Sequence, residues 1–547
     1  MTTNVIDATQ TDPAFQQLSE GVLIHSAALT EDAKALLTPE AVALLATLSR
    51  EFEPSRQTLL ATRLDRQARF DAGEVPQYLD RQSEAVRGDW RVAPLPKDLQ
   101  KRRVEITGPV NSTKMVINML SRNSDGFRAD CAMLDFEDSM KPSWTNVVDG
   151  VHNFLGAAKG DLRHVDPARA DRPEKVYQLD ADDMALVMVR VRGLHLDESN
   201  LLIDGKPVSG GLLDLVLCWF HGAKELIKRG KTPKFYVPKV EHYLEARWWN
   251  DIFTKLEAAL DLPLSTLRAT FLIETLPAAF QIEEILYELR DHAAGLNVGR
   301  WDKIFSDIKT LKFHKDRVMA DRASIGMNRP WMNNYAKRLI QICHQRGASA
   351  LGGMAAFTPG RDAELRQKQT EKVAADKQWE FDAGHDGCWV SHPYFIGTAM
   401  SAFTVDNQLD VMPEGDKYPD LLPQSGGPRT LEGLRTNARV GIAYLEGWQR
   451  DIGCIAWDNL MEDLATLEIS RAQTWQWLHH GVSLDCGTPV TTELIGKIFD
   501  EELARIYDEL GAAANRDSWQ QAYATAVELF TAKDFQPFLS MASDLAG

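Results

Sequence analysis

From about residue 102 onward, short apolar runs alternate with longer segments of helical periodicity. Each run has the length and composition of a strand buried on both faces, as the strands of parallel sheets are. Such alternation predicts a parallel α/β sheet, either closed into a (β/α)8 barrel or open and doubly wound. Sequence does not show closure, but a count of eight runs favours the barrel. The runs are residues 104–107, 132–136, 185–190, 235–240, 270–273, 296–298, 350–357 and 388–390.

Helical periodicity fills the space between several runs and also precedes the first one. Residues 211–228 and 242–260 repeat apolar positions at helical spacing and are candidate crossover helices. In the first 95 residues, one helix is predicted from Thr38-Pro39-Glu40. A second helix is predicted from about Pro54, with an end at Gly73.

After about residue 405 the chain returns to helical patterns. The stretch 407–428 is rich in Pro, Gly and Asp and predicts a linker. Trp475 and Trp477 are two residues apart, so we expect at most one of them to face a core at helical spacing. The predicted helices are residues 434–448, 460–478 and 494–510.

Composition and charge narrow the class of partner. The 547 residues are 44% hydrophobic and 25% charged, as in a soluble globular protein of several domains. Lys and Arg number 61 against 78 Asp and Glu, a net charge of −17 that argues against nucleic acid or an anionic membrane as a partner. No signal-peptide pattern or membrane-spanning run occurs, and the six cysteines are scattered without a CxxC pair. We therefore expect a cytoplasmic protein with reduced thiols.

Acidic residues follow two consecutive predicted strands. Glu274 and Asp302 each come just after an apolar run. The carboxyl ends of barrel strands meet at one rim, so two hard oxygen ligands of the kind that magnesium needs would lie there together. Alternatively, both carboxylates cap helices or pair with Arg290 and Arg300. Spacing alone does not decide between these interpretations.

Other polar residues follow the remaining strands. One arginine of the Arg190-Val191-Arg192 sequence could clamp a carboxylate at the rim, while its neighbour faces the other side of the strand. The Gly-rich segment 384–393 would allow a ligand to approach closely. A pair of metal-binding carboxylates and an arginine suit an α-keto acid as substrate. The bound ion polarises the carbonyl group, and the arginine offsets developing negative charge. An obvious base is missing from this set.

Five segments lie in order between about residue 102 and residue 477: MLDFEDSMKPSW (133–144), VRVRGLHL (189–196), FLIETLPAAFQIEEILYELRDHAAGLNVGRWDKIFSDIKTLK (271–312), GHDGCWVSHP (384–393) and NLMEDLATLEISRAQTWQW (459–477). Together they closely resemble malate synthases of the A isoform. The family plan implies an N-terminal helical clasp (1–95), a central TIM barrel with the metal and glyoxylate site (96–405) and a C-terminal helical domain with the base (406–547). The larger G isoform carries an extra α/β insertion, for which this chain has no room.

The resemblance implies a Claisen condensation of acetyl-CoA with glyoxylate, followed by hydrolysis of the malyl thioester to malate and CoA. By the same resemblance, Glu274 and Asp302 are the Mg²⁺ ligands, with glyoxylate oxygens and waters completing the coordination. Arg190 is the catalytic arginine rather than Arg192, and Asp463 is the missing base. A base on a separate helical domain would let closure assemble the site after both substrates bind.

Further residues take subsidiary parts in this prediction. Glyoxylate is expected to contact Arg190 and the two metal ligands, Glu274 and Asp302. It is also expected to accept hydrogen bonds from backbone N–H groups of the turn that holds Gly299, Arg300 and Trp301. Cys454 either lies near the thioester or is a small buried apolar residue. We expect a monomer, and the residues that bind CoA are not predicted. The residues expected to surround the metal ligands are Asp135, Glu137 and Asp138.

Two alternatives belong to other classes. A lyase of the citrate-lyase β-subunit type uses similar acids and an arginine on a barrel, but would lack a long C-terminal domain with Asp463. A non-catalytic scaffold is the second alternative. The joint presence of Arg190, Glu274, Asp302 and Asp463 argues against a loss of activity.

Overall fold

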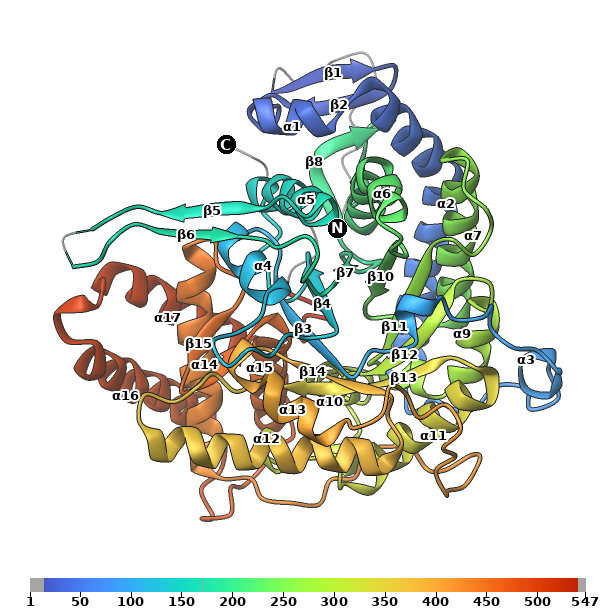
Figure 1. Ribbon diagram of the computed structural model, residues 1–547. Helices are drawn as coiled ribbons and strands as arrows, with labels where there is room; N and C mark the ends of the chain where they lie inside the picture. The colour runs from blue at the N-terminus through green and yellow to red at the C-terminus, as the bar shows by residue number, and fades with distance from the viewer. Residues whose placement is uncertain (1–13, 170, 540–547) are drawn as a thin grey trace.

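Eight parallel strands close into a barrel at the centre of the molecule (Figure 1). The computed structural model describes residues 14–169 and 171–539. Each predicted run overlaps one strand, and neighbours pair in the order β10-β11-β12-β13-β14-β3-β4-β7, so the closed barrel is confirmed over the open sheet. The strands are β3 (Val104–Pro109), β4 (Cys131–Asp135), β7 (Leu186–Arg190), β10 (Lys234–Val237), β11 (Arg268–Ile273), β12 (Ala293–Val298), β13 (Ser349–Ala355) and β14 (Gly387–Val390).

Side chains fill the interior of this barrel. Arg102 and Glu105 form a buried ion pair at 2.7 Å, and the Tyr236 hydroxyl donates to Glu105. Trp389 Nε1 donates to the same carboxylate at 3.1 Å, and apolar side chains such as Met133 and Leu272 pack around the network. The barrel is therefore a packed core rather than a channel, which leaves its rim as the place for chemistry.

Helices surround the barrel and connect its strands. The predicted crossovers at 211–228 and 242–260 are confirmed as α6 and α7. Several helices begin with a side-chain cap: Thr275, for example, accepts a hydrogen bond from Ala278 N. The helices are α4 (Thr113–Leu120), α5 (Trp144–Lys159), α6 (Gly210–Lys228), α7 (Tyr243–Ala259), α8 (Leu276–Ala279), α9 (Ile282–Glu288), α10 (Trp301–Thr310), α11 (Pro330–Arg346), α12 (Ala363–Ala383) and α13 (Ile396–Ala402).

The N-terminal region is less helical than predicted. After β1 (Phe15–Ser19) and β2 (Val22–His25), the chain forms α1 (Glu31–Leu36), α2 (Pro39–Asp71) and α3 (Glu84–Arg87). The two strands join a hairpin inserted between barrel elements, β8 (Asp197–Ile203) and β9 (Lys206–Ser209), in a four-stranded antiparallel sheet. Sequence reasoning missed this sheet because its central pairing joins segments almost 180 residues apart, where local patterns carry no signal.

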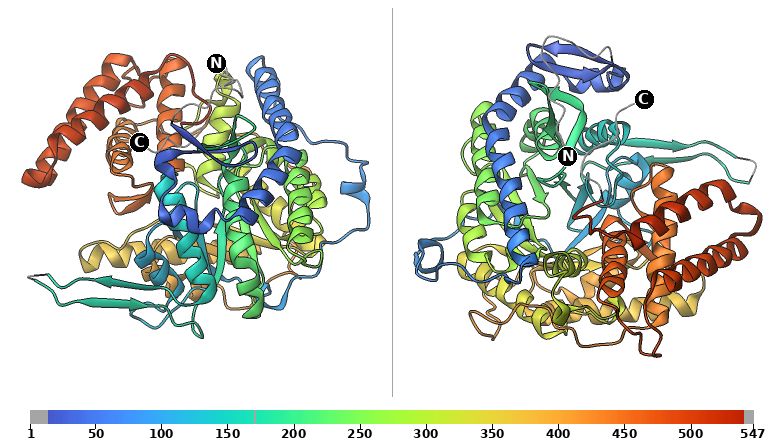
Figure 2. Two further views of the ribbon diagram at one scale, coloured as in Figure 1. Left: turned by 90° about the horizontal axis from the view of Figure 1, so that it is seen from above. Right: turned by 180° about the vertical axis from the view of Figure 1, so that it is seen from behind.

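The helix break predicted near Pro54 is wrong, because α2 is continuous through that residue. Tertiary contacts hold the helix on both sides of the proline, although the proline removes one hydrogen bond of the helix. Trp248 Nε1 donates to Phe52 O at 3.1 Å, and Arg56 Nε donates to Leu194 O at 2.7 Å. Arg63 forms a two-pronged ion pair with Glu245 on α7, so the long helix is clamped along the barrel (Figure 2).

The C-terminal region forms a helical unit beside the barrel (Figure 2). The helix predicted to begin at residue 460 begins instead at Leu464, because residues 455–462 form a hairpin. Trp475 and Trp477 are both buried, contrary to our prediction, since α15 is enclosed on most sides by barrel and C-terminal helices. The elements are α14 (Leu431–Gln449), β15 (Ile455–Trp457), β16 (Leu460–Glu462), α15 (Leu464–His479), α16 (Thr492–Leu510) and α17 (Arg516–Thr531).

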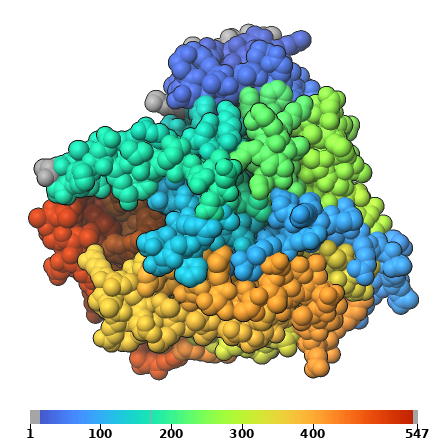
Figure 3. All heavy atoms as spheres, viewed as in Figure 1, coloured from blue at the N-terminus to red at the C-terminus, as the bar shows by residue number. Residues whose placement is uncertain are grey.

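A further hairpin, β5 (Arg163–Asp166) and β6 (Lys175–Gln178), projects from the barrel (Figure 1). The space-filling view shows a hollow between this hairpin, α12 and the C-terminal helices (Figure 3).

Within the described ranges, no helix is both long and apolar enough to cross a membrane. The domain boundaries near 95 and 405 stay predictions, and residues 1–13 and 540–547 of the predicted end domains lie outside the described residues. The 3-10 turns are Ser26–Ala28, Lys97–Leu99, Lys315–Arg317, Arg322–Ser324, Pro393–Phe395 and Gly511–Ala513.

Candidate active site

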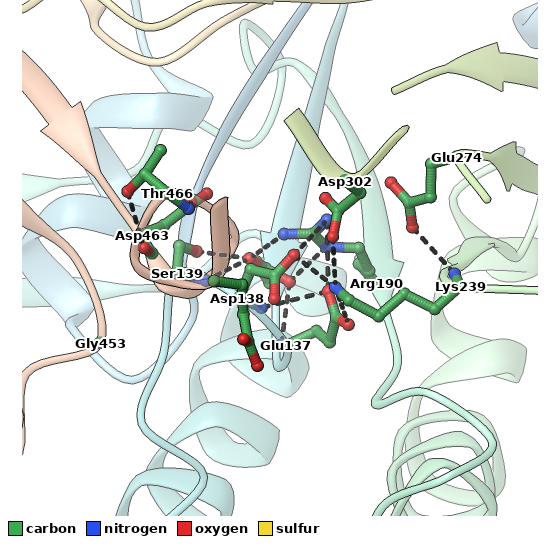
Figure 4. Close-up of polar contacts among 12 residues, drawn as sticks. Glu137, Asp138, Ser139, Arg190, Lys239, Glu274, Asp302, Gly453, Asp463 and Thr466 are labelled. Atoms are coloured by element: carbon green, nitrogen blue, oxygen red, sulfur yellow. Dashed lines mark hydrogen bonds and ion pairs between the residues drawn. The ribbon is translucent and has the colours of Figure 1, made fainter. Parts of the chain in front are cut away.

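Five carboxylates and two cations meet at the carboxyl-terminal rim of the barrel (Figure 4). They come from the ends of β4, β7, β10 and β11 and from the first turn of α10, and each is nearly or completely buried. We call the acids the carboxylate cluster. Its members are Asp135, Glu137, Asp138, Glu274 and Asp302, and the cations are Arg190 and Lys239.

Arg190 is held in a fixed orientation by Asp135. Its Nε and Nη2 atoms each donate to an Asp135 oxygen at 2.6 Å, which is the two-pronged geometry that fixes a guanidinium most firmly. Ser139 donates to Asp135 through both its backbone N and its hydroxyl, at 2.9 and 2.5 Å. Although burial raises the pKa of Asp135, the Arg190 charge and these hydrogen bonds outweigh it and lower the pKa. The third guanidinium nitrogen of Arg190, Nη1, lies 3.4 Å from Glu137 Oε2.

Arg192 lies in a different network. It forms ion pairs with Asp214 at 2.8 Å and Glu198 at 2.9 Å, all buried away from the cluster. Arg192 thus lies apart from Arg190, as predicted, but the alternation of a strand is not the reason. Positions two apart on a strand share a face, and β7 ends at Arg190, so Arg192 lies beyond the strand.

Lys239 links the members of the cluster. Its ammonium lies 2.5 Å from Glu137, 2.6 Å from Asp138 and 3.1 Å from Asp302. Its backbone N donates to Glu274 Oε1 at 2.8 Å. Although burial lowers the pKa of the ammonium, the nearby carboxylates outweigh it and leave the pKa well above its ordinary value. The sequence pattern gave Lys239 no role, although its position after a barrel strand was a signal that it could lie at this rim.

Burial and mutual repulsion raise the pKa values of several cluster members. The pKa of Glu274 lies well above its usual range because of burial and the Asp302 charge. Burial also raises the pKa of Asp302, and burial with the Asp138 charge raises that of Glu137. The site is therefore short of positive charge.

This donor set fits a divalent cation. Among the described residues, Asp302 Oδ1 and Asp138 Oδ1 are buried and accept no hydrogen bond, although Asp302 Oδ1 is ion-paired with Lys239. Five carboxylates against two cations leave negative charge that a hard cation would offset. No group of three His, Cys, Asp or Glu in the described part of the chain is arranged to hold a metal. Glu274 and Asp302 would therefore need oxygen ligands from substrate or water.

The helix-cap alternative for these two acids is not supported. Thr275 caps α8, and no described side chain caps the start of α10. In place of the arginine pairs that the alternative required, Arg290 donates to Tyr287 O and Arg300 lies over the Trp301 ring at 4.6 Å. The bare start of α10 leaves first-turn N–H groups for an anionic ligand.

Gly299 allows the chain to pass close to Glu274. A Cβ atom at Gly299 would lie 2.6 Å from Glu274 Cβ and 2.7 Å from its Oε2. Such an approach is possible only without a side chain, so glycine here sets the spacing between the end of β12 and Glu274.

Asp463 comes to the same region from the C-terminal unit. It is the N-cap of α15 and accepts a hydrogen bond from Thr466 N at 3.3 Å. The next residue, Leu464, donates its backbone N–H to Asp138 O at 3.2 Å, which ties the start of α15 to the cluster. Burial raises the pKa of Asp463 well above its usual range, with added contributions from Asp138 and Asp302.

The segment before Asp463 is fitted closely against the loop after β4. A Cβ atom at Gly453 would lie 2.2 Å from Lys141 N. Cys454 follows and is partly buried, and burial together with the Asp463 charge raises its thiol pKa to about 12. This thiol is therefore protonated near neutral pH, and because the Asp463 charge acts on it, both interpretations of Cys454 stay predictions.

Two further contacts join the barrel side of the site to the segment that carries Asp463. Arg322, in a turn after α10, forms an ion pair with Glu462 at 3.0 Å and lies over the Trp301 ring at 5.6 Å. Ile304 on α10 packs with Ile469 on α15 in a common apolar cluster. The helix that begins beside Asp302 is thereby packed against the helix that begins at Asp463.

Phe538, near the end of the described chain, covers the cluster and was not predicted from sequence. Its ring stacks on His195 at 4.2 Å and lies beneath the Lys309 ammonium at 4.4 Å. It lines two small cavities, of about 20 and 10 Å³, both of which are also lined by Lys239. Each has room for about one water.

Comparisons with known proteins agree over most of the chain. Family models described as "Malate synthase, N-terminal domain", "Malate synthase, TIM barrel domain" and "Malate synthase, C-terminal" match residues 27–83, 186–422 and 428–544. One solved structure, the Haloferax volcanii malate synthase ternary complex with pyruvate and acetyl-CoA, has a TM-score of 0.41 at 13% identity, covering 77% of this chain and 98% of that chain. A similarity this low adds nothing to the assignment.

Curated relatives are much more similar. Malate synthase A of Escherichia coli strain K12 is 45% identical over 489 residues, covering 88% of this chain and 90% of the relative. The malate synthase of Myxococcus xanthus is 46% identical over 515 residues, covering 92% and 93%. The glyoxysomal malate synthase of Ricinus communis is 42% identical and covers 96% and 94%. Identity of this extent, together with the three domain matches, shows that the chain belongs to the malate synthase family.

Proposed function

We propose that this chain is an Mg²⁺-dependent malate synthase, an acyltransferase that condenses acetyl-CoA with glyoxylate and hydrolyses the resulting thioester to malate and CoA. The observation that carries the proposal is the meeting of a buried carboxylate pair, an oriented arginine and a carboxylate from a separate unit at one rim. Membership in the family supports it.

The barrel rim supplies the electrophilic half of the reaction. Mg²⁺ bound there would polarise the aldehyde carbonyl of glyoxylate. Glu274 and Asp302 would hold the ion, and the first-turn N–H groups of α10 would receive the glyoxylate carboxylate. Arg190, kept in place by Asp135, offsets the negative charge that develops on the enolate and alkoxide oxygens.

The C-terminal unit supplies the base. Asp463 accepts a proton from the acetyl methyl group, and the electron pair of that C–H bond becomes the enolate. The enolate carbon then bonds to the aldehyde carbon, whose π electrons move onto its oxygen. Once deprotonated, a carboxylate with a raised pKa is a stronger base than an exposed aspartate, which helps with so weak an acid. Phe538 and the small volume around Lys239 limit water at this stage.

The proposal is tested by CoA release from purified protein with acetyl-CoA, glyoxylate and Mg²⁺. We expect release by the wild type and a loss of about 100- to 10,000-fold for Asp463→Asn. Asp458→Asn is a matched control, because Asp458 lies in the turn of the same hairpin and its side chain is 56% exposed. No release by the wild type, or full release by Asp463→Asn, would contradict the proposal.

The citrate-lyase β-type alternative lacks a C-terminal unit of the kind formed by α14 to α17. For location, the six free cysteines support a reducing compartment, and we propose the cytoplasm. The monomeric state stays a prediction, which light scattering tests against the chain mass of 61.3 kDa.

A further inference from the structure

Lys239 has an unusual place among the charged residues of the rim. Its ammonium contacts three carboxylates, Glu137, Asp138 and Asp302, at 2.5 to 3.1 Å. These acids belong to two separate segments, the loop after β4 and the start of α10. Through its backbone N–H the same residue also holds a fourth, Glu274, after β11. The side chain crosses from the Glu274 side of the site to the centre of the cluster, beside Asp302 (Figure 4).

The backbone of Lys239 is also unusual. Its φ of +52° lies in the left-handed region, which glycine adopts more readily than lysine. The carbonyl of Lys239 accepts a hydrogen bond from Arg63 Nη2 at 2.9 Å, so α2 fixes this conformation from outside. Glycine would satisfy the backbone at a lower cost, so the reason for a lysine must lie in its ammonium group.

The charges around Lys239 indicate what its ammonium group does. Two donor atoms of Arg190 bind Asp135, and its third nitrogen, Nη1, lies 3.4 Å from Glu137 and 3.8 Å from Asp138. The Lys239 ammonium is closer to both of these acids and also contacts Asp302, so it is their nearest counter-charge. Without it, four buried carboxylates would face one another with little to offset their repulsion. A divalent cation held by Glu274 and Asp302 would lie close to the ammonium, and the two positive charges would repel.

We propose that Lys239 is a positioning residue whose ammonium is an internal counter-cation: it keeps the carboxylate cluster assembled without a divalent cation and competes with that cation for the cluster. This inference rests on the proposed function, because it takes Glu274 and Asp302 as the cation ligands. It differs from a purely structural role in one respect. Loss of a structural lysine weakens folding and cation binding together, whereas loss of a counter-cation weakens the metal-free fold but strengthens cation binding.

The test is Lys239→Met, which keeps most of the apolar stem and removes the charge. Two quantities are measured: Tm in EDTA by circular dichroism, and the Kd for Mn²⁺, a probe for the Mg²⁺ site, by electron paramagnetic resonance. We expect a lower Tm in EDTA, a Mn²⁺ Kd tighter by about tenfold, and a larger rise in Tm on adding Mn²⁺ than in wild type. Lys239→Arg, which keeps the charge, should restore most of the EDTA Tm and leave the Kd within about threefold of wild type.

Lys309→Met is the matched control. Lys309 is a buried lysine near the same rim, but its ion pair, at 2.5 Å, is with Glu241 outside the cluster. This variant should lose Tm without tightening the Kd.

A Mn²⁺ Kd for Lys239→Met that is equal to or weaker than that of wild type overturns the role of Lys239. If Lys239→Met does not fold even with Mn²⁺, Lys239→Arg decides: loss of Mn²⁺ binding in that variant overturns the inference, and retained binding supports it. A wild-type protein that binds neither Mn²⁺ nor Mg²⁺ instead contradicts the metal site of the proposed function.

Discussion

The two sides of the site are held in place in different ways. On the barrel side, Asp135 and Arg190 are register partners on adjacent strands, so the hydrogen bonds of a closed sheet set the position of the arginine. Asp463 instead follows a short hairpin, which docks on the barrel through a few backbone bonds, such as Met461 N to Ala356 O at 2.7 Å and Thr358 N to Asn459 O at 3.0 Å.

This difference implies that the two sides can be perturbed separately. Changes on the barrel side should alter the binding of cation and glyoxylate. Changes on the hairpin side should alter turnover and leave cation binding intact, because the hairpin supplies no member of the carboxylate cluster. Three substitutions test this separation, and a fourth changes a buried acid outside both sides.

Asp302→Asn should have the largest effect. It removes one proposed cation ligand, so we expect the Mn²⁺ affinity to fall by more than about 100-fold and metal-dependent glyoxylate binding to be lost. Because burial raises the pKa of Asp302, a neutral side chain is tolerated there, and the Tm in EDTA should not fall. Calorimetry with glyoxylate and Mg²⁺ measures the binding. An unchanged glyoxylate affinity would contradict the metal role.

Arg322→Met should lower kcat by about 10- to 100-fold, because it breaks the ion pair between the turn after α10 and Glu462, beside the base. The Mn²⁺ Kd should remain that of wild type. This variant also leaves the Glu462 carboxylate buried without its ion-pair partner. The double variant Arg322→Met/Glu462→Gln removes that unpaired charge, so comparing the two variants separates this effect from misplacement of Asp463. A weaker Mn²⁺ affinity with unchanged kcat would show that Arg322 supports the barrel side of the site rather than the position of Asp463.

Gly453→Ala should lower kcat by about tenfold, because the new Cβ would lie 2.2 Å from Lys141 N and push the segment before Asp463 outward. Gly496→Ala is the matched control: Gly496 lies within α16, and a Cβ there meets nothing within 4 Å. The control should be slightly stabilised and fully active. Equal kcat values for the two variants would show that the fit of this segment does not control the base.

Glu380→Gln should have the smallest effect on the site and changes only the pH dependence of stability. Burial raises the pKa of Glu380 from 4.5 to about 7, and Lys377 at 3.0 Å offsets this only in part. Between pH 4.5 and pH 7 the folded state keeps the Glu380 proton that the unfolded state has lost. The contribution of Glu380 to the free energy of unfolding is therefore full below pH 4.5 and is lost as the pH rises through 7.

From pH 5 to pH 8, the free energy of unfolding of Glu380→Gln should therefore rise relative to wild type by up to about 3 kcal/mol. Urea unfolding at the two pH values measures it, and CoA release should be unchanged because Glu380 lies on α12, outside the cluster. Identical pH dependence in the two proteins would show that Glu380 is not protonated in the fold.

Sequence reasoning reached the barrel side of the site more easily than the base side. Strand length and apolar composition predicted all eight strands, and the end of a strand predicts where Glu274 lies because parallel strands end at one rim. Asp463 could not be found in this way. Its segment was predicted as the first turn of a helix, and the hairpin that places it depends on contacts with residues 356–358, about 100 positions away. It came from the family resemblance alone.

Other features depended on tertiary contacts that no local pattern contains. The chain continues helical through Pro54 because barrel residues hold α2 on both sides of it. Lys239 carries no motif, and its importance follows from acids brought together by three different segments. The cover formed by Phe538 depends on the return of the chain end across the rim.

The central claim is that Asp463 is the base that acts on a substrate held by the barrel rim. It is tested most directly by exchange of the acetyl-CoA methyl protons with D₂O, followed by NMR, with Mg²⁺ and a keto acid such as pyruvate in place of glyoxylate. The account predicts exchange by the wild type and none above background by Asp463→Asn, with Mn²⁺ affinity unchanged. Exchange by Asp463→Asn at the wild-type rate would contradict it.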